Sequence, residues 1–407
     1  MTGLVLIGVS VRALAQPVAG ARRGVTGVDF FGDRDRERGV ETLALARDLG
    51  LPASAEGLAE AAVRLRAETV VYCANLENHP DVVEALARRC EVAGNDAGTV
   101  REVRDPRRLR VFCREAGVAY PETLVPGEEH EADPRRGWLV KRVRSGGGHG
   151  IRPWTGSRLA PGHILQEVVD GVPASVSFAA DGSDCRVFAF CEQLAGRAAF
   201  GAAGFTWCGN LLPFTAAAGS SGELHRQATV LARKLSRRFG LRGVNGADVI
   251  VSQAGGRVRL HLLEVNPRYS ASMELAQWAC GLDVLHLHLE ACAGRLPDDA
   301  AAPEPAGCFG KAVVYARDAV TVPGTDAWAG LGRRDVPYRG ERVGRGHPLC
   351  TVVARGADRA EVVRLLERRA AEVYAGLAPA ARGEQAGGGV GRDGRRESFE
   401  LIGKVVR

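Results

Sequence analysis

Two oxygen-bearing side chains and an arginine stand together near the middle of the chain. The apolar stretch that begins at His261 ends in Glu264, Asn266 and Arg268. Residues i and i+2 of a strand point to the same face, so the carboxylate and the amide are expected to face one point. Hard cations such as Mg2+ prefer oxygen ligands, and arginine offers a fork of donors suited to phosphate. The spacing therefore predicts a metal and phosphate site and indicates ATP-dependent chemistry.

A third oxygen ligand is expected from a neighbouring strand. Residues 246–252 and 258–265 read as antiparallel strands joined by a hairpin, which would bring Asp248 beside Glu264 and Asn266. The three oxygens could then hold one or two Mg2+ ions on the phosphates of ATP. A turn-capping role is the alternative for Asp248.

A glycine-rich loop precedes this region. Lys141 lies on an expected strand, 138–142, and the loop leads to a second strand, 151–154, so it differs from a P-loop, which opens a helix. The loop glycines are Gly146, Gly147, Gly148 and Gly150. A hairpin of this kind can fold over phosphates and offer backbone N–H groups, while Lys141 adds a point charge. Taken alone, the loop could equally be a mobile surface hairpin.

The next strand, 164–169, ends in a segment that could meet a nucleotide base. Its last residues are Gln166, Glu167, Val168 and Val169. Main-chain groups here could hydrogen-bond an adenine edge while a valine packs on the ring. Without the neighbouring motifs this segment would be merely a strand.

The elements that must position these residues suggest four parts. Residues 1–104 alternate strands (3–9, 25–31, 69–73) with helices, which predicts a doubly wound α/β domain. Residues 105–295 contain antiparallel strands and helices at 106–116, 221–239 and 272–294, an α+β pattern. Residues 296–378 read as a small β-rich domain with strands at 310–316 and 349–354 and a helix at 358–376. Residues 379–407 read as a Gly- and Arg-rich tail with a terminal strand.

Composition narrows the class of protein. The 407 residues are 25% charged and 45% hydrophobic with a net charge of +6, which is ordinary for a soluble globular protein and does not favour nucleic-acid binding. The ten cysteines form no Cys-x-x-Cys pair, so a zinc or redox motif is not expected. No apolar stretch approaches the length of a membrane span. We therefore expect a cytoplasmic protein that binds neither membrane nor nucleic acid.

These motifs, in this order, resemble the ATP-grasp superfamily over about residues 1–295. The resemblance implies an α/β N-terminal domain followed by an α+β ATP-grasp fold whose two subdomains clamp ATP. It also implies a ligase reaction: a carboxylate takes the γ-phosphate to give an acyl phosphate, and an amine then displaces phosphate. The implied cofactors are ATP and Mg2+, with Mn2+ as an alternative.

The resemblance also assigns roles to residues. Lys141 and the loop glycines correspond to phosphate contacts, Gln166 to Val169 to the adenine hinge, and Asp248, Glu264 and Asn266 to the metal ligands. Arg268, together with Lys141, corresponds to the catalytic residues that stabilise the transferring phosphoryl group or the acyl phosphate.

Three positions qualify this correspondence. Arg108 stands where the family often has its first phosphate-binding lysine, and Arg107 is nearly as plausible. Pro173 occupies the place of the usual ribose-binding acid, which leaves the ribose contact unassigned. Gly246 replaces an arginine that some peptide ligases carry.

A closer resemblance is to predicted ATP-dependent carboligases, whose relatives include tyramine–glutamate ligases. It rests on the segments Gly8-Val-Ser-Val-Arg12 and Asp29-Phe-Phe-Gly-Asp33. It implies small-molecule carboxylate and amine substrates, with glutamate as a candidate in cofactor biosynthesis, and a homodimer. Ser10 and Arg12 would face the substrate end of the cleft, although helix capping and a surface position are equal alternatives.

Other readings have less support. A nicotinamide-dependent oxidoreductase would need a second and a third glycine after Gly8, which the sequence lacks. A non-catalytic ATP-binding module would be expected to have lost some of the metal ligands. His286 and His288 are two apart on an expected helix and make a poor metal pair. His149 could touch phosphate, and Tyr269, Ser270 and Ser272 could line the acceptor site, but loop and capping roles are alternatives.

Overall fold

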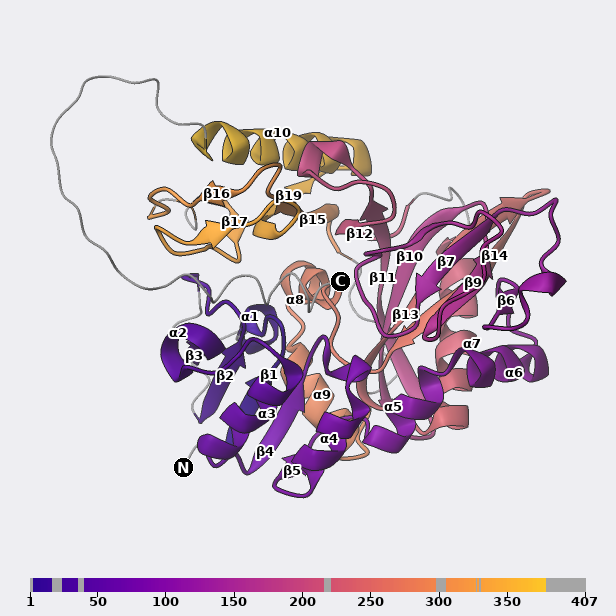
Figure 1. Cartoon of the computed structure of the whole chain (residues 1–407), viewed down its shortest axis with the longest axis horizontal. Helices are drawn as coiled ribbons and strands as arrows, with labels where there is room; N and C mark the ends of the chain where they lie inside the picture. The colour runs from indigo at the N-terminus through magenta and orange to yellow at the C-terminus, as the bar shows by residue number, and fades with distance from the viewer. Residues whose placement is uncertain are drawn as a thin grey trace, which may run out of the picture.

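A five-stranded parallel sheet forms the N-terminal part of the molecule (Figure 1), in the order β3-β2-β1-β4-β5. The structure, a computed structural model, describes residues 3–16, 24–35, 40–215, 221–297, 305–326, 328 and 331–377. The strands are β1 Leu4–Ile7, β2 Val25–Asp29, β3 Glu41–Ala44, β4 Thr69–Tyr72 and β5 Glu91–Val92. The strand order reverses between β1 and β4, and ligands bind open α/β sheets in the crevice beyond such a point.

Helices cover this sheet on both sides. They are α1 Arg12–Ala15, α2 Leu45–Leu49, α3 Ala55–Arg64, α4 Pro80–Ala87 and α5 Ala97–Val103, with a short 3-10 turn, η1, at Leu76–Asn78. Ser54 caps α3 by accepting a hydrogen bond from the N–H of Gly57 (3.0 Å), and α3 packs on β1 and β2. The α/β pattern predicted for this part is present, although β3 was not predicted.

A small antiparallel sheet carries the glycine loop. Its order is β6-β9-β7-β8, with β6 Thr123–Leu124, β7 Trp138–Arg142, β8 Arg152–Pro153 and β9 His163–Glu167. Helix α6, Pro106–Ala116, leads into it and ends at Gly117, whose φ of +64° suits glycine. A 3-10 turn, η2 Glu129–Glu131, lies between β6 and β7. The side chains of Leu124, Trp138, Val140, Leu159 and Leu165 form the core of this sheet.

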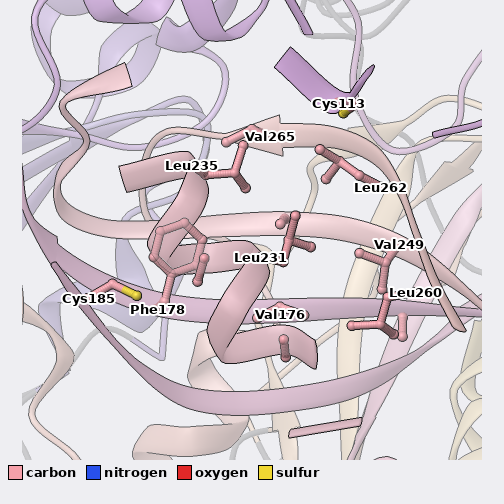
Figure 2. Packing of buried hydrophobic residues seen from close by; sticks show 14 of the residues in the cluster. Cys113, Val176, Phe178, Cys185, Leu231, Leu235, Val249, Leu260, Leu262 and Val265 are labelled. Atoms are coloured by element: carbon pink, nitrogen blue, oxygen red, sulfur yellow. The ribbon is translucent and has the colours of Figure 1, made fainter. Parts of the chain in front are cut away.

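An eight-stranded antiparallel sheet is the largest element, in the order β14-β13-β10-β11-β12-β15-β19-β17. Its strands are β10 Val172–Asp181, β11 Cys185–Ala195, β12 Trp207–Leu212, β13 Arg242–Ala254, β14 Arg257–Asn266, β15 Cys308–Tyr315, β17 Arg333–Arg334 and β19 Pro348–Gly356; a 3-10 turn, η3 Ala198–Phe200, precedes β12. Helix α7, Ser221–Phe239, covers one face. Figure 2 shows Leu231 and Leu235 of α7 beside Val176, Phe178 and Val249 of the sheet, all buried.

The other face of this sheet meets the N-terminal part through two helices, α8 Met273–Cys280 and α9 Val284–Cys292 (Figure 1). Met273 and Val284 share one apolar cluster with Leu6 and Leu14 of the N-terminal part. The prediction of one helix over 272–294 is wrong, because Gly281 turns the chain at φ +64° and Asp283 caps a new helix.

The C-terminal strands extend the large sheet. β15 pairs with β12, and β19 pairs with β15, so the strands predicted at 310–316 and 349–354 are present but are bonded to the preceding sheet. Helix α10, Arg359–Leu377, packs on both strands, and β16 Val320–Thr321 pairs with β18 Arg342–Val343. The fold class is the predicted one, whereas the four domain boundaries stay a prediction. The tail at 379–407 lies outside the described residues.

Candidate active site

One large cavity lies where the three main sheets meet. It has a volume of about 1840 Å³. Its walls come from the loops after β1 and β4, the glycine loop after β7, the end of β9 and one face of the large sheet. Typical small-molecule sites measure roughly 300–1,000 Å³, so this cavity has room for a nucleotide and a second small molecule.

A row of polar side chains crosses the large sheet on the cavity face. Strand register places Asp248 of β13 opposite Glu264 of β14 and Ser175 of β10, and Asn210 of β12 opposite Gln193 of β11 and Lys311 of β15. All six side chains line the cavity. Directly paired residues share a face of an antiparallel sheet. The sheet thus presents these groups together although they are far apart in sequence.

The predicted metal ligands lie side by side. Asp248 accepts hydrogen bonds from Asn266 (Nδ2 to Oδ2, 2.9 Å) and from Gln193 (Nε2 to Oδ1, 2.8 Å). Burial, reinforced by the charge of Glu264, raises the pKa of Asp248 to about 7. Two carboxylates and an amide that crowd each other in this way form an oxygen donor set suited to Mg2+. Within the described residues, no three His, Cys, Asp or Glu side chains are grouped as a metal site, so the amide would be needed.

Arg104 is the basic residue that reaches these ligands from the N-terminal side. Its guanidinium donates to Glu264 (Nη1 to Oε2, 3.1 Å), to Asn78 (3.1 Å) and to the carbonyls of Val143 (3.1 Å) and Ser145 (3.3 Å). Its side chain is only 9% exposed. One side chain thus joins the N-terminal domain, the strand of the predicted metal ligands Glu264 and Asn266, and the start of the glycine loop.

Arg107 and Arg108, the predicted phosphate contacts, lie elsewhere. Both are exposed, and Arg108 forms a long ion pair with Glu102 (3.5 Å) and has 56% of its side chain in solvent. Neither lines the cavity, whereas Arg104 does. The physical reason is that Asp105 caps α6 and Pro106 starts it, which turns the next two side chains toward solvent. The structure therefore does not bring Arg108 to the site.

Lys141 is held in the cavity wall. Its Nζ donates to Oε1 of Gln166 (2.6 Å), and Gln166 in turn donates to Thr123 (3.1 Å). Burial lowers the pKa of Lys141, an effect opposed by Glu264 and Asp248. Lys141 is therefore a positive charge aimed at the same region as the two carboxylates.

The predicted adenine hinge is engaged in the sheet. The N–H of Glu167 donates to Glu122 and that of Val168 to Gly137 (both 2.8 Å), so these two groups are not available to a base. Val168 is 41% exposed and lines the cavity with Val169. The segment thus offers an apolar surface for a ring. Pro173 also lines the cavity, and no acid stands at its position.

Arg268 crosses to the N-terminal domain. It donates to Glu77 (Nη2 to Oε1, 2.6 Å) and to Asn266 (3.2 Å). Burial disfavours its charge, but Glu77 more than offsets this and raises the pKa of Arg268. Glu77 was not singled out from the sequence. The ion pair fixes Arg268 beside the predicted metal ligands at the cavity wall.

The glycine loop is docked on the large sheet. The N–H of Trp207 donates to the carbonyl of Gly147 (2.9 Å), and a Cβ at Gly148 would overlap the carbonyl oxygen of Phe205. Gly148 and Gly150 have φ of +71° and +75°, values that favour glycine. Gly146, Gly147 and Gly148 line the cavity, whereas Gly150 does not, and the ring of His149 lies edge-on to Tyr315.

The remaining candidates divide between the cavity and the core. Ser10, Tyr269, Ser270 and Ser272 line the cavity, and Ser272 lies within 3.3 Å of Ser175, Ser177 and Ser270. Arg12, for which a surface position was an alternative, is buried. His288 is buried between the N–H of Val244 and the carbonyl of Ala93, while His286 is exposed, so they form no pair.

Comparison with known protein families identifies one domain of the chain. Residues 105–272 match the family model of the ATP-grasp domain. The chain therefore contains an ATP-grasp domain and has the fold of this superfamily. No curated protein matches the sequence.

Several solved structures share this fold at low sequence identity. Pyruvate carboxylase from Rhizobium etli has a TM-score of 0.66 at 15% identity; the match covers 90% of this chain, which spans 37% of that protein. The biotin carboxylase domain of 2-oxoglutarate carboxylase from Hydrogenobacter thermophilus, in complex with MgADP, ADP and bicarbonate, gives 0.66 at 14%, covering 90% and 89% of the two chains. N5-carboxyaminoimidazole ribonucleotide synthetase from Thermus thermophilus gives 0.60 at 16%, covering 93% and 100%.

Proposed function

We propose that this protein is an ATP- and Mg2+-dependent ligase that joins a carboxylate to an amine through an acyl phosphate. The observation that carries the proposal is the grouping of Asp248, Glu264 and Asn266 with Lys141 and Arg268 on the wall of one cavity. The ATP-grasp domain and the room for a second molecule support it.

The reaction balances in two steps. A carboxylate oxygen of the acid attacks the γ-phosphorus, and the bond to the bridging oxygen breaks to release ADP. The nitrogen of a neutral amine then attacks the acyl carbon, and phosphate leaves with the C–O bonding electrons and accepts the proton lost by nitrogen. The product is an amide.

The side chains supply charge and orientation for both steps. Lys141 and the docked glycine loop would hold the phosphates, and Arg268, fixed by Glu77, would stabilise charge on the transferring group. Asp248, Glu264 and Asn266 would hold Mg2+, which neutralises phosphate charge when bound.

The resemblance to tyramine–glutamate ligases makes glutamate our first candidate for the acid, within cofactor biosynthesis. Bicarbonate belongs in the same test, because it is the bound anion in the carboxylase domain of similar fold. Mn2+ is tested in place of Mg2+.

We also propose a cytoplasmic homodimer, for which sedimentation of the purified chain tests the oligomeric state. None of the described helices is both long and apolar enough to cross a membrane.

The decisive experiment measures ADP release over a matrix of acids and amines, with mass spectrometry of the products. Asn266→Ala is expected to lower kcat by about 100-fold or more, the range seen when one electrostatic group of an active site is removed. Gln253→Ala, an exposed position on the same β13–β14 hairpin, is the control and should retain activity. An Asn266→Ala protein that folds and keeps full ATP-dependent product formation would contradict the proposal. Tight ATP binding without turnover over the whole matrix would favour a non-catalytic module.

A further inference from the structure

Four buried acceptor atoms of the described residues have no hydrogen-bond partner, and all four residues line the cavity. They are Asp33 Oδ2, Asn75 Oδ1, Glu77 Oε2 and Asn210 Oδ1. A buried polar atom without a partner costs about 1–3 kcal/mol, so such atoms are rare in native proteins and call for an explanation. Four acceptors around one space indicate a ligand that donates hydrogen bonds.

Asp33 is the charged member of this set that lies away from the phosphate site. It follows β2, at the carboxyl end of the N-terminal sheet, and only 7% of it is exposed. Glu77, in contrast, already binds Arg268 through its other oxygen. Asp33 therefore presents a carboxylate oxygen to the cavity with no protein donor to satisfy it.

The neighbouring charged groups cannot supply that donor, because they are engaged with one another. Arg12 binds Asp335 (2.7 Å) and Glu274 (2.6 Å), and Lys311 binds Glu274. Asp35 accepts from the N–H groups of Asp335 (3.1 Å) and Val336 (2.8 Å). Asp29 accepts from the N–H groups of Val11, Phe31 and Gly32.

The charge balance of this region is negative. Its buried carboxylates are Asp29, Asp33, Asp35 and Glu274, with Asp335 partly exposed, and its buried cations are Arg12, Lys311 and Arg333. Burial raises the pKa of Asp33 well above its usual range, and the nearby carboxylates Asp335, Asp29 and Asp35 raise it further. A cation placed against Asp33 would relieve both the repulsion and the unpaired oxygen.

We propose that the amine substrate carries a second, cationic nitrogen, and that Asp33 binds this nitrogen as an ammonium group. This inference rests on the proposed ligase function. The nitrogen that attacks an acyl phosphate must be neutral, whereas a nitrogen held against a buried carboxylate keeps its proton. The substrate class is therefore a diamine or another amine with a basic group, because the cations nearest to Asp33, Arg12 and Lys311, are already paired with the protein carboxylates Glu274 and Asp335.

The test compares matched ligands that differ in one ammonium group. The pairs are 1,4-diaminobutane with 1-aminopentane, 1,5-diaminopentane with 1-aminohexane, and L-lysine with L-norleucine. Calorimetric binding to the full chain, with a non-hydrolysable ATP analogue and Mg2+ present, is expected to show at least one ligand with two ammonium groups binding 10-fold or more tightly than its partner. Asp33→Asn, which keeps the shape and removes the charge, should abolish that difference. Asp318→Asn, at an exposed position that does not line the cavity, should preserve it.

Equal affinity within all three pairs, or a difference that survives in Asp33→Asn, overturns the inference. If Asp33→Asn does not fold, the comparison of matched ligands on the wild-type chain decides alone. Hydroxylamine added to the wild-type protein with ATP and the panel of acids separates this inference from the ligase proposal. Hydroxamate formation without a preference for amines with two ammonium groups removes only the cation site, whereas no hydroxamate with any acid removes the ligase proposal.

Discussion

Arg104 shows how much one side chain can decide at this site. It contacts a predicted metal ligand, Glu264, and the carbonyls of Val143 and Ser145, which lead into the glycine loop. A guanidinium can serve all of these partners because it has five donors in a fixed plane. Arg104 is therefore placed to set both the orientation of Glu264 and the position of the loop.

Replacing this arginine should weaken ATP use selectively. Arg104→Ala is expected to lower kcat/KM for ATP by about 10- to 100-fold, since hydrogen bonds to charged groups contribute roughly 1.5–3 kcal/mol. Arg108→Ala is the matched control, because Arg108 was the predicted phosphate contact but is exposed and outside the cavity. Steady-state kinetics on both variants decide between the two positions. An equal or larger loss in Arg108→Ala would contradict the assignment.

The sequence could single out the three proposed metal ligands but could not single out Arg104. Asp248, Glu264 and Asn266 follow from strand periodicity and one hairpin, which are local rules. Arg104, Gln193 and Glu77 reach the site only because distant segments fold against it, and arginines are too frequent in this chain for one to stand out. Arg107 and Arg108, the two alternatives that the sequence offered, lie outside the cavity because the capping of α6 turns their side chains outward, a geometric effect that spacing alone does not reveal.

At the scale of elements, the β7–β8 hairpin depends on close backbone approach to the large sheet. Gly147 accepts from Trp207, and Gly148 leaves no space for a Cβ beside Phe205. The glycines thus serve two separate needs, the positive φ and the docking. The sequence indicated a glycine-rich hairpin but not the surface on which the loop docks.

Two substitutions distinguish the effect of the positive φ from the effect of docking on the large sheet. Gly148→Ala should raise the KM for ATP at least 10-fold, because its Cβ would overlap the Phe205 carbonyl oxygen and displace the loop. Gly150→Ala has the same unfavourable φ but nothing within 4 Å of its Cβ, so it should show only the conformational cost of about 1 kcal/mol. Kinetics and thermal unfolding of both variants test this. Indistinguishable KM values for ATP would show that docking is unimportant.

The pairing of the C-terminal strands could not be predicted from local sequence patterns. The stretches that become β15 and β19 were predicted as strands from their apolar residues, yet the pairing of β15 with β12 was not. Gly209 of β12 explains part of this pairing, since a Cβ at this position would overlap the carbonyl oxygen of Lys311. Such a contact belongs to two segments that are far apart in the sequence, and neither segment predicts it alone.

At the scale of the whole molecule, a buried ion network joins three parts of the chain. Arg12 follows the first strand, Glu274 lies on α8 and Lys311 lies on β15. These elements belong to the N-terminal sheet, the helical layer and the large sheet (Figure 1). The network therefore fixes the N-terminal domain over the cavity that it helps to form.

Glu274 is the member of this network whose contribution to stability can be measured through its pH dependence. Burial alone would raise its pKa, but Arg12 and Lys311 outweigh burial and lower the pKa to about 2, from 4.5 in the unfolded chain. A carboxylate with a lowered pKa stabilises the fold above its unfolded pKa, and this stabilisation is lost as the pH falls through the folded pKa. The expected contribution is roughly 3 kcal/mol at pH 7 and about half of that at pH 3.

Glu274→Gln should therefore lower the urea midpoint strongly at pH 7 and less at pH 3. The variant leaves Lys311 buried without its carboxylate, which explains why the loss is large despite the similar shape of glutamine. Glu290→Gln, at a position on α9 whose carboxylate pairs with Arg295 at the surface, is the control and should leave the midpoint unchanged at both pH values. Urea unfolding of the three proteins, followed by tryptophan fluorescence, measures the difference. A loss at pH 3 as large as that at pH 7 would show that packing, and not the charge of Glu274, holds these parts together.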